Sequence, residues 1–301
     1  MPTQPETQLP PVELGGMRVL RKLPQITLLF WLLKTVAVTL GETAGDLFGI
    51  TFRIGYLPTA LVFLGFFLAV VVAQVRAERH HPALYWATVL GTSLVGTEIS
   101  DLMNRGLGHG SAPRGIGYGG GAVLLTTALL LVFLLWQRTG QTYDVENISS
   151  RTGEILYWTA ILVSNTLGTS TGDWLSDDTG LGFRNAFLVI AAVLVLITAA
   201  HFLTPVSGTL LFWTAFVLTR PLGAAGGDYL TKPVAEGGLG WGTAGGSAAL
   251  CTLLAGLIAC QRAALRRRPM PPLPAPTDRR TGVPQRPNGA LVAASAARSA
   301  S

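Results

Sequence analysis

Residues 219–228 read TRPLGAAGGD and directly follow the apolar run GTLLFWTAFVL at 208–218. The stretch places an arginine, a proline, glycines and an aspartate at the end of a segment that is apolar enough for a membrane helix. Related stretches occur three more times, and each one ends on an aspartate. The four aspartates are Asp46, Asp101, Asp173 and Asp228. A pattern that returns four times predicts an internal repeat, and this repeat decides the fold.

Other residue types stand at fixed distances from the four aspartates. A tryptophan lies fifteen residues before each aspartate, directly after another aromatic residue, and a glycine lies five residues before it. The tryptophans are Trp31, Trp86, Trp158 and Trp213, and the glycines are Gly41, Gly96, Gly168 and Gly223. The aspartates are 55, 72 and 55 residues apart. The repeating unit is therefore a pair of helices, and two such units form each half of the chain. A pseudo-two-fold symmetry relates the two halves.

Composition places the chain among membrane proteins. It has 301 residues, of which 49% are hydrophobic and 13% charged, and a mean hydropathy of +0.45. Soluble domains carry about 25% charged residues. The net charge of +6 comes mostly from arginines near the C-terminus, which is typical of a topology signal rather than of a nucleic-acid site. No nucleotide-binding, hydrolase or kinase motif occurs, so we expect neither an enzyme nor a cofactor.

The apolar segments predict an all-α integral membrane protein with eight spanning helices, each near the 20 residues that a helix needs. The predicted spans are 25–46, 55–75, 82–102, 116–136, 153–174, 183–203, 208–229 and 242–261. The predicted parts are an N-terminal tail (1–23), repeat 1 (24–80), repeat 2 (81–137), a linker (138–152), repeat 3 (153–207), repeat 4 (208–262) and a disordered basic C-terminal tail (263–301).

Lysine and arginine counts predict the topology. With the N-terminus inside, the cytoplasmic flanks hold eleven of these residues. The opposite loops hold Arg53, Arg105, Arg114, Arg184 and Lys232. This bias predicts that both termini are cytoplasmic. Because each unit crosses twice, the four repeats are parallel, and all four aspartates face the outer side.

The aspartates raise a question because each is predicted at the C-terminal end of a helix, where exposed carbonyls already carry partial negative charge. Carbonyls together with a carboxylate make a cation site, although each aspartate could instead be solvated. Glu42 and Glu98 lie four and three residues before Asp46 and Asp101, on the same helix face. The predicted ion-binding residues are Glu42, Asp46, Glu98, Asp101, Asp173 and Asp228, with Glu42, Asp46, Glu98 and Asp101 as the metal ligands. The predicted polar lining is Thr43, Thr97, Asn165 and Thr169.

Two basic residues are expected inside the membrane and need partners. We expect Arg220 to pair with Glu42 or Glu98, and Lys34 to pair with an acid across the bundle or to extend toward the inner interface. Pro221 should break or kink its helix beside Arg220. The glycines predict close helix packing, and the tryptophans predict a belt at the inner membrane interface.

The segments KTVAVTLGETAGDL, YWATVLGTSLVGTEISDL, YWTAILVSNTLGTSTGDWL and FWTAFVLTRPLGAAGGDYL carry a resemblance. Over roughly 28–262 the chain resembles a bacterial family of membrane-anchored proteins built from four tandem repeats of unknown function. The resemblance implies the architecture and a bacterial cytoplasmic (inner) membrane. The ETAGD stretch is also similar to the Glu-x-Gly-Asp motifs of small cation/proton exchangers for calcium or manganese, although it is one residue longer.

Three functions follow as hypotheses. The first is a secondary transporter that moves a cation, of the divalent class, against protons. The second is a transporter of an anion or small organic solute that uses Arg220 and Lys34. The third is a membrane scaffold in which the repeats serve only packing. The expected partners are membrane lipids and a small ion or solute, with a homo-oligomer left open.

Overall fold

The computed structural model describes residues 23–77, 79–106, 115–148 and 150–268. Over these ranges it contains eight long α-helices, four short helical turns and no β-strand, which confirms the all-α prediction for this part of the chain. The helices are α1 Leu28–Asp46, α2 Tyr56–Arg76, α3 Pro82–Arg105, α4 Tyr118–Arg138, α5 Arg151–Asp173, α6 Gly182–Leu203, α7 Gly208–Thr231 and α8 Gly242–Arg267. Because α8 continues to Arg267, the predicted start of the C-terminal tail at 263 is wrong. Residues 1–22 and 269–301 lie outside the described residues.

The first helices of the four repeats form a closed ring. The helix α1 packs against α3 and α7, and α5 packs against the same two helices. The helices α1 and α5 therefore face each other across the ring, as do α3 and α7. Four segments that are distant in sequence thus surround one shared interior.

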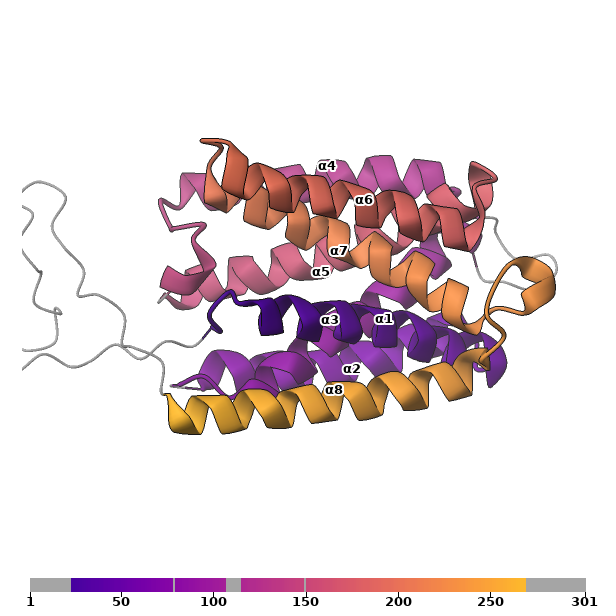
Figure 1. The fold of residues 1–301 in the computed structure, drawn as a ribbon, viewed down its shortest axis with the longest axis horizontal. Helices are drawn as coiled ribbons and strands as arrows, with labels where there is room; N and C mark the ends of the chain where they lie inside the picture. The colour runs from indigo at the N-terminus through magenta and orange to yellow at the C-terminus, as the bar shows by residue number, and fades with distance from the viewer. Residues whose placement is uncertain (1–22, 78, 107–114, 149, 269–301) are drawn as a thin grey trace, which may run out of the picture. The chain divides into compact units, whose positions relative to one another are not determined.

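Each second helix packs on the first helix of the following repeat. The helix α2 packs on α3, α4 on α5 and α6 on α7, and α8 returns to α1. Figure 1 shows α8 running alongside α1, although the two lie at opposite ends of the chain. The two helices of one repeat are consecutive in sequence, but they do not pack as a pair. The first helix belongs to the ring, and the second covers the ring helix of the next repeat.

The repeated glycines allow the ring helices to approach closely. A Cβ atom at each of them would press into the next ring helix, always at the residue eight before that helix's aspartate. The glycines Gly41, Gly96, Gly168 and Gly223 face Ser93, Asn165, Arg220 and Val38, respectively. The predicted close packing of small residues is therefore confirmed, and it follows the same rule at all four interfaces.

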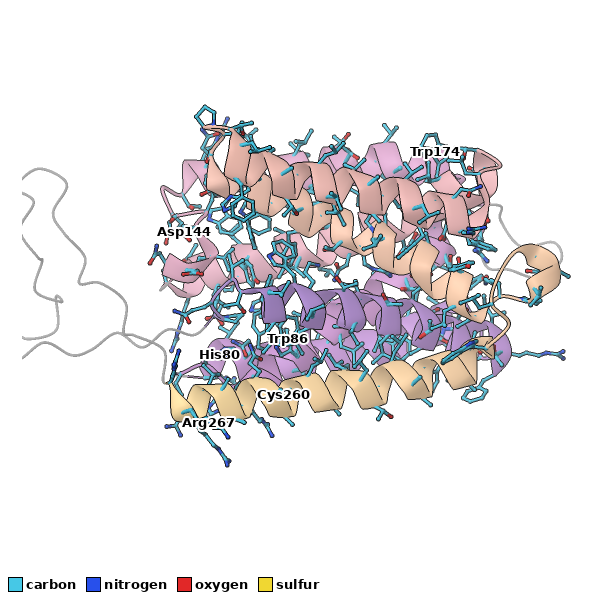
Figure 2. All side chains as sticks on the ribbon, in the orientation of Figure 1. His80, Trp86, Asp144, Trp174, Cys260 and Arg267 are labelled. Atoms are coloured by element: carbon cyan, nitrogen blue, oxygen red, sulfur yellow. The ribbon has the colours of Figure 1, made fainter. Side chains whose placement is uncertain are left out.

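The aromatic pairs close the ring at the end opposite the aspartates. The first aromatic residue of each repeat contacts the tryptophan of the next, with ring centroids 5.5–6.1 Å apart. These pairs are Phe30–Trp86, Tyr85–Trp158, Tyr157–Trp213 and Phe212–Trp31. Figure 2 labels Trp86 nearer the end where Arg267 lies, and Trp174, which follows Asp173, at the other end.

The interface-belt interpretation of the tryptophans is wrong for three of them. Trp86, Trp158 and Trp213 are buried in the aromatic cluster, while Trp31 is half-buried. The Trp86 indole N–H donates to Gln261 of α8 across 2.7 Å. The rings point toward the next repeat because the ring helices are themselves enclosed.

Five helices in the described residues are long and apolar enough to cross a membrane: the segment Leu28–Thr51, α2, α4, α6 and α8. The helices α3, α5 and α7 fall short in apolar composition because they bury many polar side chains inside the ring. The helices α2, α4 and α6 expose large apolar side chains along their length, and α8 exposes Leu253. A surface of this kind is compatible with lipid and costly in water.

Proline and glycine have local effects at two kinds of position. The helix α7 runs unbroken from Gly208 to Thr231 through Pro221, so the predicted break is wrong, and the predicted kink stays a prediction. The glycines that open the second helices are explained by their backbone conformation. Gly55 and Gly117 adopt φ angles of 87° and 78°, in the left-handed region that favours glycine.

Candidate functional site

The four aspartates lie at one end of the ring, and all are at most 5% exposed. Asp46 and Asp173 end their helices, and a π-helical turn follows each of them, at Leu47–Thr51 and Trp174–Asp178. In α3 and α7 the helix continues past the aspartate for about one more turn. Repeats 1 and 3 thus share one ending and repeats 2 and 4 another, as a two-fold relation between the halves requires.

Lys232, which follows α7, bridges two of the aspartates. Its Nζ lies 3.0 Å from Asp46 Oδ2 and 3.4 Å from Asp228 Oδ1. Partial burial disfavours the charged form of Lys232, but the carboxylates of Asp228 and Asp46 outweigh that effect and raise the pKa of its amine. Lys232 is therefore a cation at neutral pH and joins the ends of α7 and α1.

Arg105 has the equivalent role in the first half. Its Nε lies 3.3 Å from Asp101 Oδ1, and its Nη2 lies 3.9 Å from Asp173 Oδ2. The guanidinium also donates to the hydroxyls of Tyr56 and Tyr118. Arg105 thus connects α3 to α5 as Lys232 connects α7 to α1.

Arg105 and Lys232 were not predicted as site residues, because both were counted among the loop residues. One signal could have found them: each stands four residues after the aspartate of its repeat, one helical turn further on. In repeats 1 and 3 the same position holds Ile50 and Asp177. The two-fold pattern of charge is therefore visible in sequence once the repeats are aligned beyond the aspartate.

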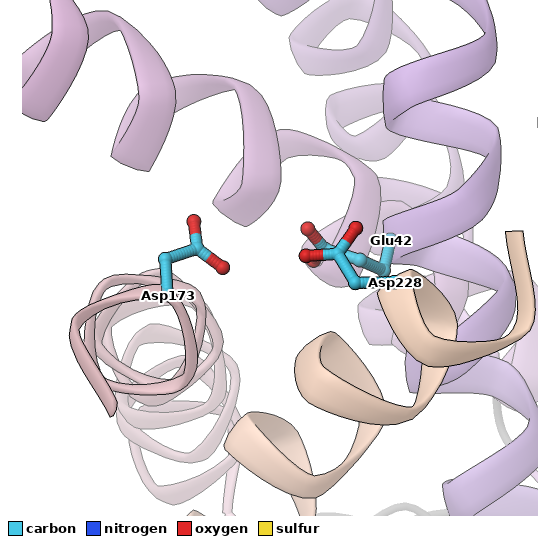
Figure 3. A group of neighbouring side chains, drawn as sticks. All are labelled: Glu42, Asp173 and Asp228. Atoms are coloured by element: carbon cyan, nitrogen blue, oxygen red, sulfur yellow. The ribbon is translucent and has the colours of Figure 1, made fainter. Parts of the chain in front are cut away.

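Three carboxylates converge inside the ring. One oxygen from each of Glu42, Asp173 and Asp228 lies within 4.8 Å of the others, and all three residues are buried. Figure 3 shows these carboxyl groups turned toward one space from α1, α5 and α7. Glu42 belongs to the predicted metal set, whereas Asp46, Glu98 and Asp101 lie outside this group. The other two members come from the second half of the chain.

Arg220 lies fully buried beside this group and contacts all three other ring helices. Its Nη2 lies within hydrogen-bond distance of three oxygens: Glu42 Oε2 of α1 at 2.8 Å, and the hydroxyls of Thr97 of α3 and Thr169 of α5 at 2.6 Å each. Glu42, Thr97 and Thr169 stand four residues before their aspartates. Arg220 therefore contacts the residue at this equivalent position in each of the three other repeats. Its pairing with Glu42 matches one of the two predicted partners.

Lys34 lies deeper in the ring and does not have the predicted acidic partner. It is 1% exposed, its Nζ lies 3.7 Å from the centroid of the Phe216 ring, and that atom has no hydrogen-bond partner among the described residues. Both predictions for Lys34 are therefore wrong in this structure. The reason is that the position faces Phe216 of the neighbouring ring helix, which offers a cation–π contact instead of a carboxylate.

The remaining predicted residues have different surroundings. Glu98 is buried against the backbone of Gly45 and Gly49, and its Oε2 has no partner within the described ranges. Asn165 donates to Thr92 across 2.8 Å, deeper than the Arg220 contacts. The Thr43 hydroxyl accepts a hydrogen bond from Ser247 of α8, so this residue faces the outer layer and does not line the interior.

A ring of four helical repeats around buried charges, with an apolar outer layer, defines a helical membrane protein with internal repeats. A family model described as the Repeat of Unknown Function (DUF347) matches residues 29–80, 84–142, 156–206 and 211–267. The chain therefore belongs to this family of four tandem repeats. Neither a curated protein nor a solved structure matches the chain.

Proposed function

We propose that this protein is a secondary transporter that moves a cation, of the divalent class, in exchange for protons. The observation that carries the proposal is the convergence of Glu42, Asp173 and Asp228 within 4.8 Å. Oxygen ligands of this type suit hard cations such as Mg²⁺, Ca²⁺ and Mn²⁺. Carboxylates that lie this close also share protons readily, which suits proton coupling. The cation is the cargo and not a resident cofactor.

The balance of buried charge supports a positively charged cargo. Six carboxylates lie in the acid half of the ring: Glu42, Asp46, Glu98, Asp101, Asp173 and Asp228. The cations that contact them are Arg105, Lys232 and Arg220. Buried charges are costly unless they are compensated. The carboxylates in excess therefore favour a bound cation, bound protons, or an exchange between the two.

The proposal includes a membrane arrangement. All eight helices cross the bilayer, both termini are cytoplasmic, and the acid end faces outward, as the lysine and arginine counts favour. The membrane is the bacterial cytoplasmic membrane. The four aromatic pairs then lie at the inner end of the helix ring and have to separate for the cargo to pass.

Transport in proteoliposomes tests the proposal. Purified protein should take up Mn²⁺ and release protons, and Asp228→Asn should reduce Mn²⁺ flux at least about tenfold because a ligand carboxylate is lost. Asp178→Asn is the matched control, because Asp178 is an exposed acid at the same end. Equal flux in the wild type, Asp228→Asn and Asp178→Asn would remove the basis of the proposal.

A second candidate is transport of an anion or small organic anion. It is favoured by the nitrogen atoms Lys34 Nζ, Arg220 Nε and Arg220 Nη1, which are buried and have no hydrogen-bond partner in the described part of the chain. In that case an anion should raise the melting temperature, and Arg220→Gln should abolish the increase. A scaffold, by contrast, would show changes in stability on substitution of the acids and no response to any ion.

A further inference from the structure

Asp228 belongs both to the ion pair with Lys232 and to the group of three carboxylates. The Lys232 ammonium contacts Asp228, and Asp228 also contributes an oxygen to the group with Glu42 and Asp173. An ammonium bound to a carboxylate reduces the negative charge that this carboxylate can offer to a second cation. The two positive charges would also repel each other over a short distance. The Lys232 ammonium and a metal ion therefore compete for the Asp228 carboxylate.

The side chain of Lys232 can move without disturbing the backbone that carries it. The backbone is held firmly: its N–H donates to the Asp228 carbonyl across 2.8 Å, and its carbonyl accepts from Gly240 N–H across 2.9 Å. The side chain is 22% exposed and consists of a flexible four-carbon stem. Displacement of its ammonium therefore requires only rotations of the side chain toward water.

Arg105, the counterpart in the first half, has more polar contacts than Lys232, although its side chain is 33% exposed. Besides Asp101 and Asp173, its guanidinium contacts the hydroxyls of Tyr56 and Tyr118 and lies 5.4 Å from the centroid of the Tyr118 ring. The hydrogen-bond acceptor that the structure gives Lys232 Nζ is Asp46. The two-fold relation between the halves is thus broken at this point: Arg105 contacts two acids and two tyrosine hydroxyls, whereas the contacts given for the Lys232 ammonium are with Asp46 and Asp228.

We propose, on the basis of the cation transport argued above, that Lys232 is a tethered competitor of the transported cation, which must displace its ammonium from Asp228 in order to bind. The lysine neutralises buried carboxylates while the transporter is empty, and the ion does so when it is loaded. The empty protein is therefore not left with uncompensated buried acids, which would be costly. Lys232 also sets the affinity for the ion and keeps it low enough for release.

Binding of Mn²⁺ to the purified full-length protein tests this inference. The variant Lys232→Met keeps the length of the side chain and removes its charge, so its Mn²⁺ dissociation constant should fall about tenfold or more. Lys232→Arg should bind Mn²⁺ with an affinity close to that of the wild type. Arg184→Met is the control for a general effect of charge, because Arg184 is an exposed cation at the same end of the helices. It should leave the affinity unchanged.

A second readout follows the displaced amine. Acylation of Lys232, measured by mass spectrometry of its peptide, should become faster when Mn²⁺ is added to the wild type. In Asp173→Asn, which lacks one of the three carboxylates, the same Mn²⁺ concentration should have little effect. Because this measurement needs no lysine substitution, it applies even if Lys232→Met does not fold.

The outcomes separate the two proposals. If Asp173→Asn leaves Mn²⁺ binding unchanged, the cation site itself is contradicted, and the inference fails with it. If Asp173→Asn weakens binding while Lys232→Met has unchanged or weaker affinity, the tethered competitor is wrong and the cation site stands. An acylation rate of Lys232 that does not respond to bound Mn²⁺ would likewise overturn the competitor role.

Discussion

Arg220 donates a hydrogen bond to the Glu42 carboxylate across 2.8 Å, although 178 residues separate them in sequence. The pair connects the last ring helix to the first and therefore closes the ring at its centre. Arg220 is fully buried, and the Glu42 side chain is 4% exposed. An ion pair so deeply buried depends on both partners, since either charge alone would be left without compensation.

Removal of one partner should therefore destabilise the protein strongly. We expect Arg220→Met to lower the free energy of unfolding by about 3–5 kcal/mol, because the Glu42 carboxylate stays buried without its cation. The double variant Arg220→Met with Glu42→Gln should recover part of this loss. Chemical unfolding in detergent micelles measures both variants. A single variant as stable as the wild type would show that the pair does not hold the ring together.

The glycine interfaces predict a second difference. Gly168→Ala should destabilise the protein by about 1–3 kcal/mol, because its Cβ would overlap the Arg220 side chain. Gly65→Ala in α2 is the control, since nothing lies within 4 Å of a Cβ at that position. It should be neutral or slightly stabilising, as alanine favours helices over glycine. Equal effects of the two substitutions on thermal unfolding would contradict close packing at the ring interface.

The Tyr85–Tyr157 contact among the aromatic pairs predicts that the effects of substitutions on stability are not additive. The hydroxyls of Tyr85 and Tyr157 lie 2.6 Å apart, and both residues are fully buried. Tyr85→Phe should cost about 1–3 kcal/mol of stability because it leaves the Tyr157 hydroxyl buried without this partner. The double variant with Tyr157→Phe should cost less than the sum of the single variants. Strict additivity in a double-mutant cycle would show that the two hydroxyls do not depend on each other.

Much of the fold was predictable from the repeat. The eight helices, the common end of the aspartates and the close glycine contacts follow from residue spacing, because a helix turns the offsets four and five into neighbouring faces. The packing of α8 on α1 was not predictable. Hydrophobic patterns show which face of a helix is buried but not which helix covers it.

The charges at the site were predictable only in part. Glu42 was one of two predicted partners of Arg220, with Glu98 as the other, because an intramembrane arginine needs an acid. The same reasoning wrongly predicted an acidic partner for Lys34, since an aromatic ring can also contact a cation. Arg105 and Lys232 were missed because topology counts treat charged residues near helix ends as solvated. The convergence of Glu42 with Asp173 and Asp228 depends on ring closure, which spacing within a repeat does not specify.

The position of a bound ion tests the cation site most directly. Anomalous diffraction from crystals of the full-length protein grown with Mn²⁺ would locate the metal without assumptions about transport. A cation site at Glu42, Asp173 and Asp228 predicts a peak among these carboxylates, with metal–oxygen distances of about 2.0–2.6 Å. It also predicts that the peak is lost in Asp173→Asn. Saturating Mn²⁺ with no peak at these carboxylates, or a peak that persists in Asp173→Asn, would contradict it.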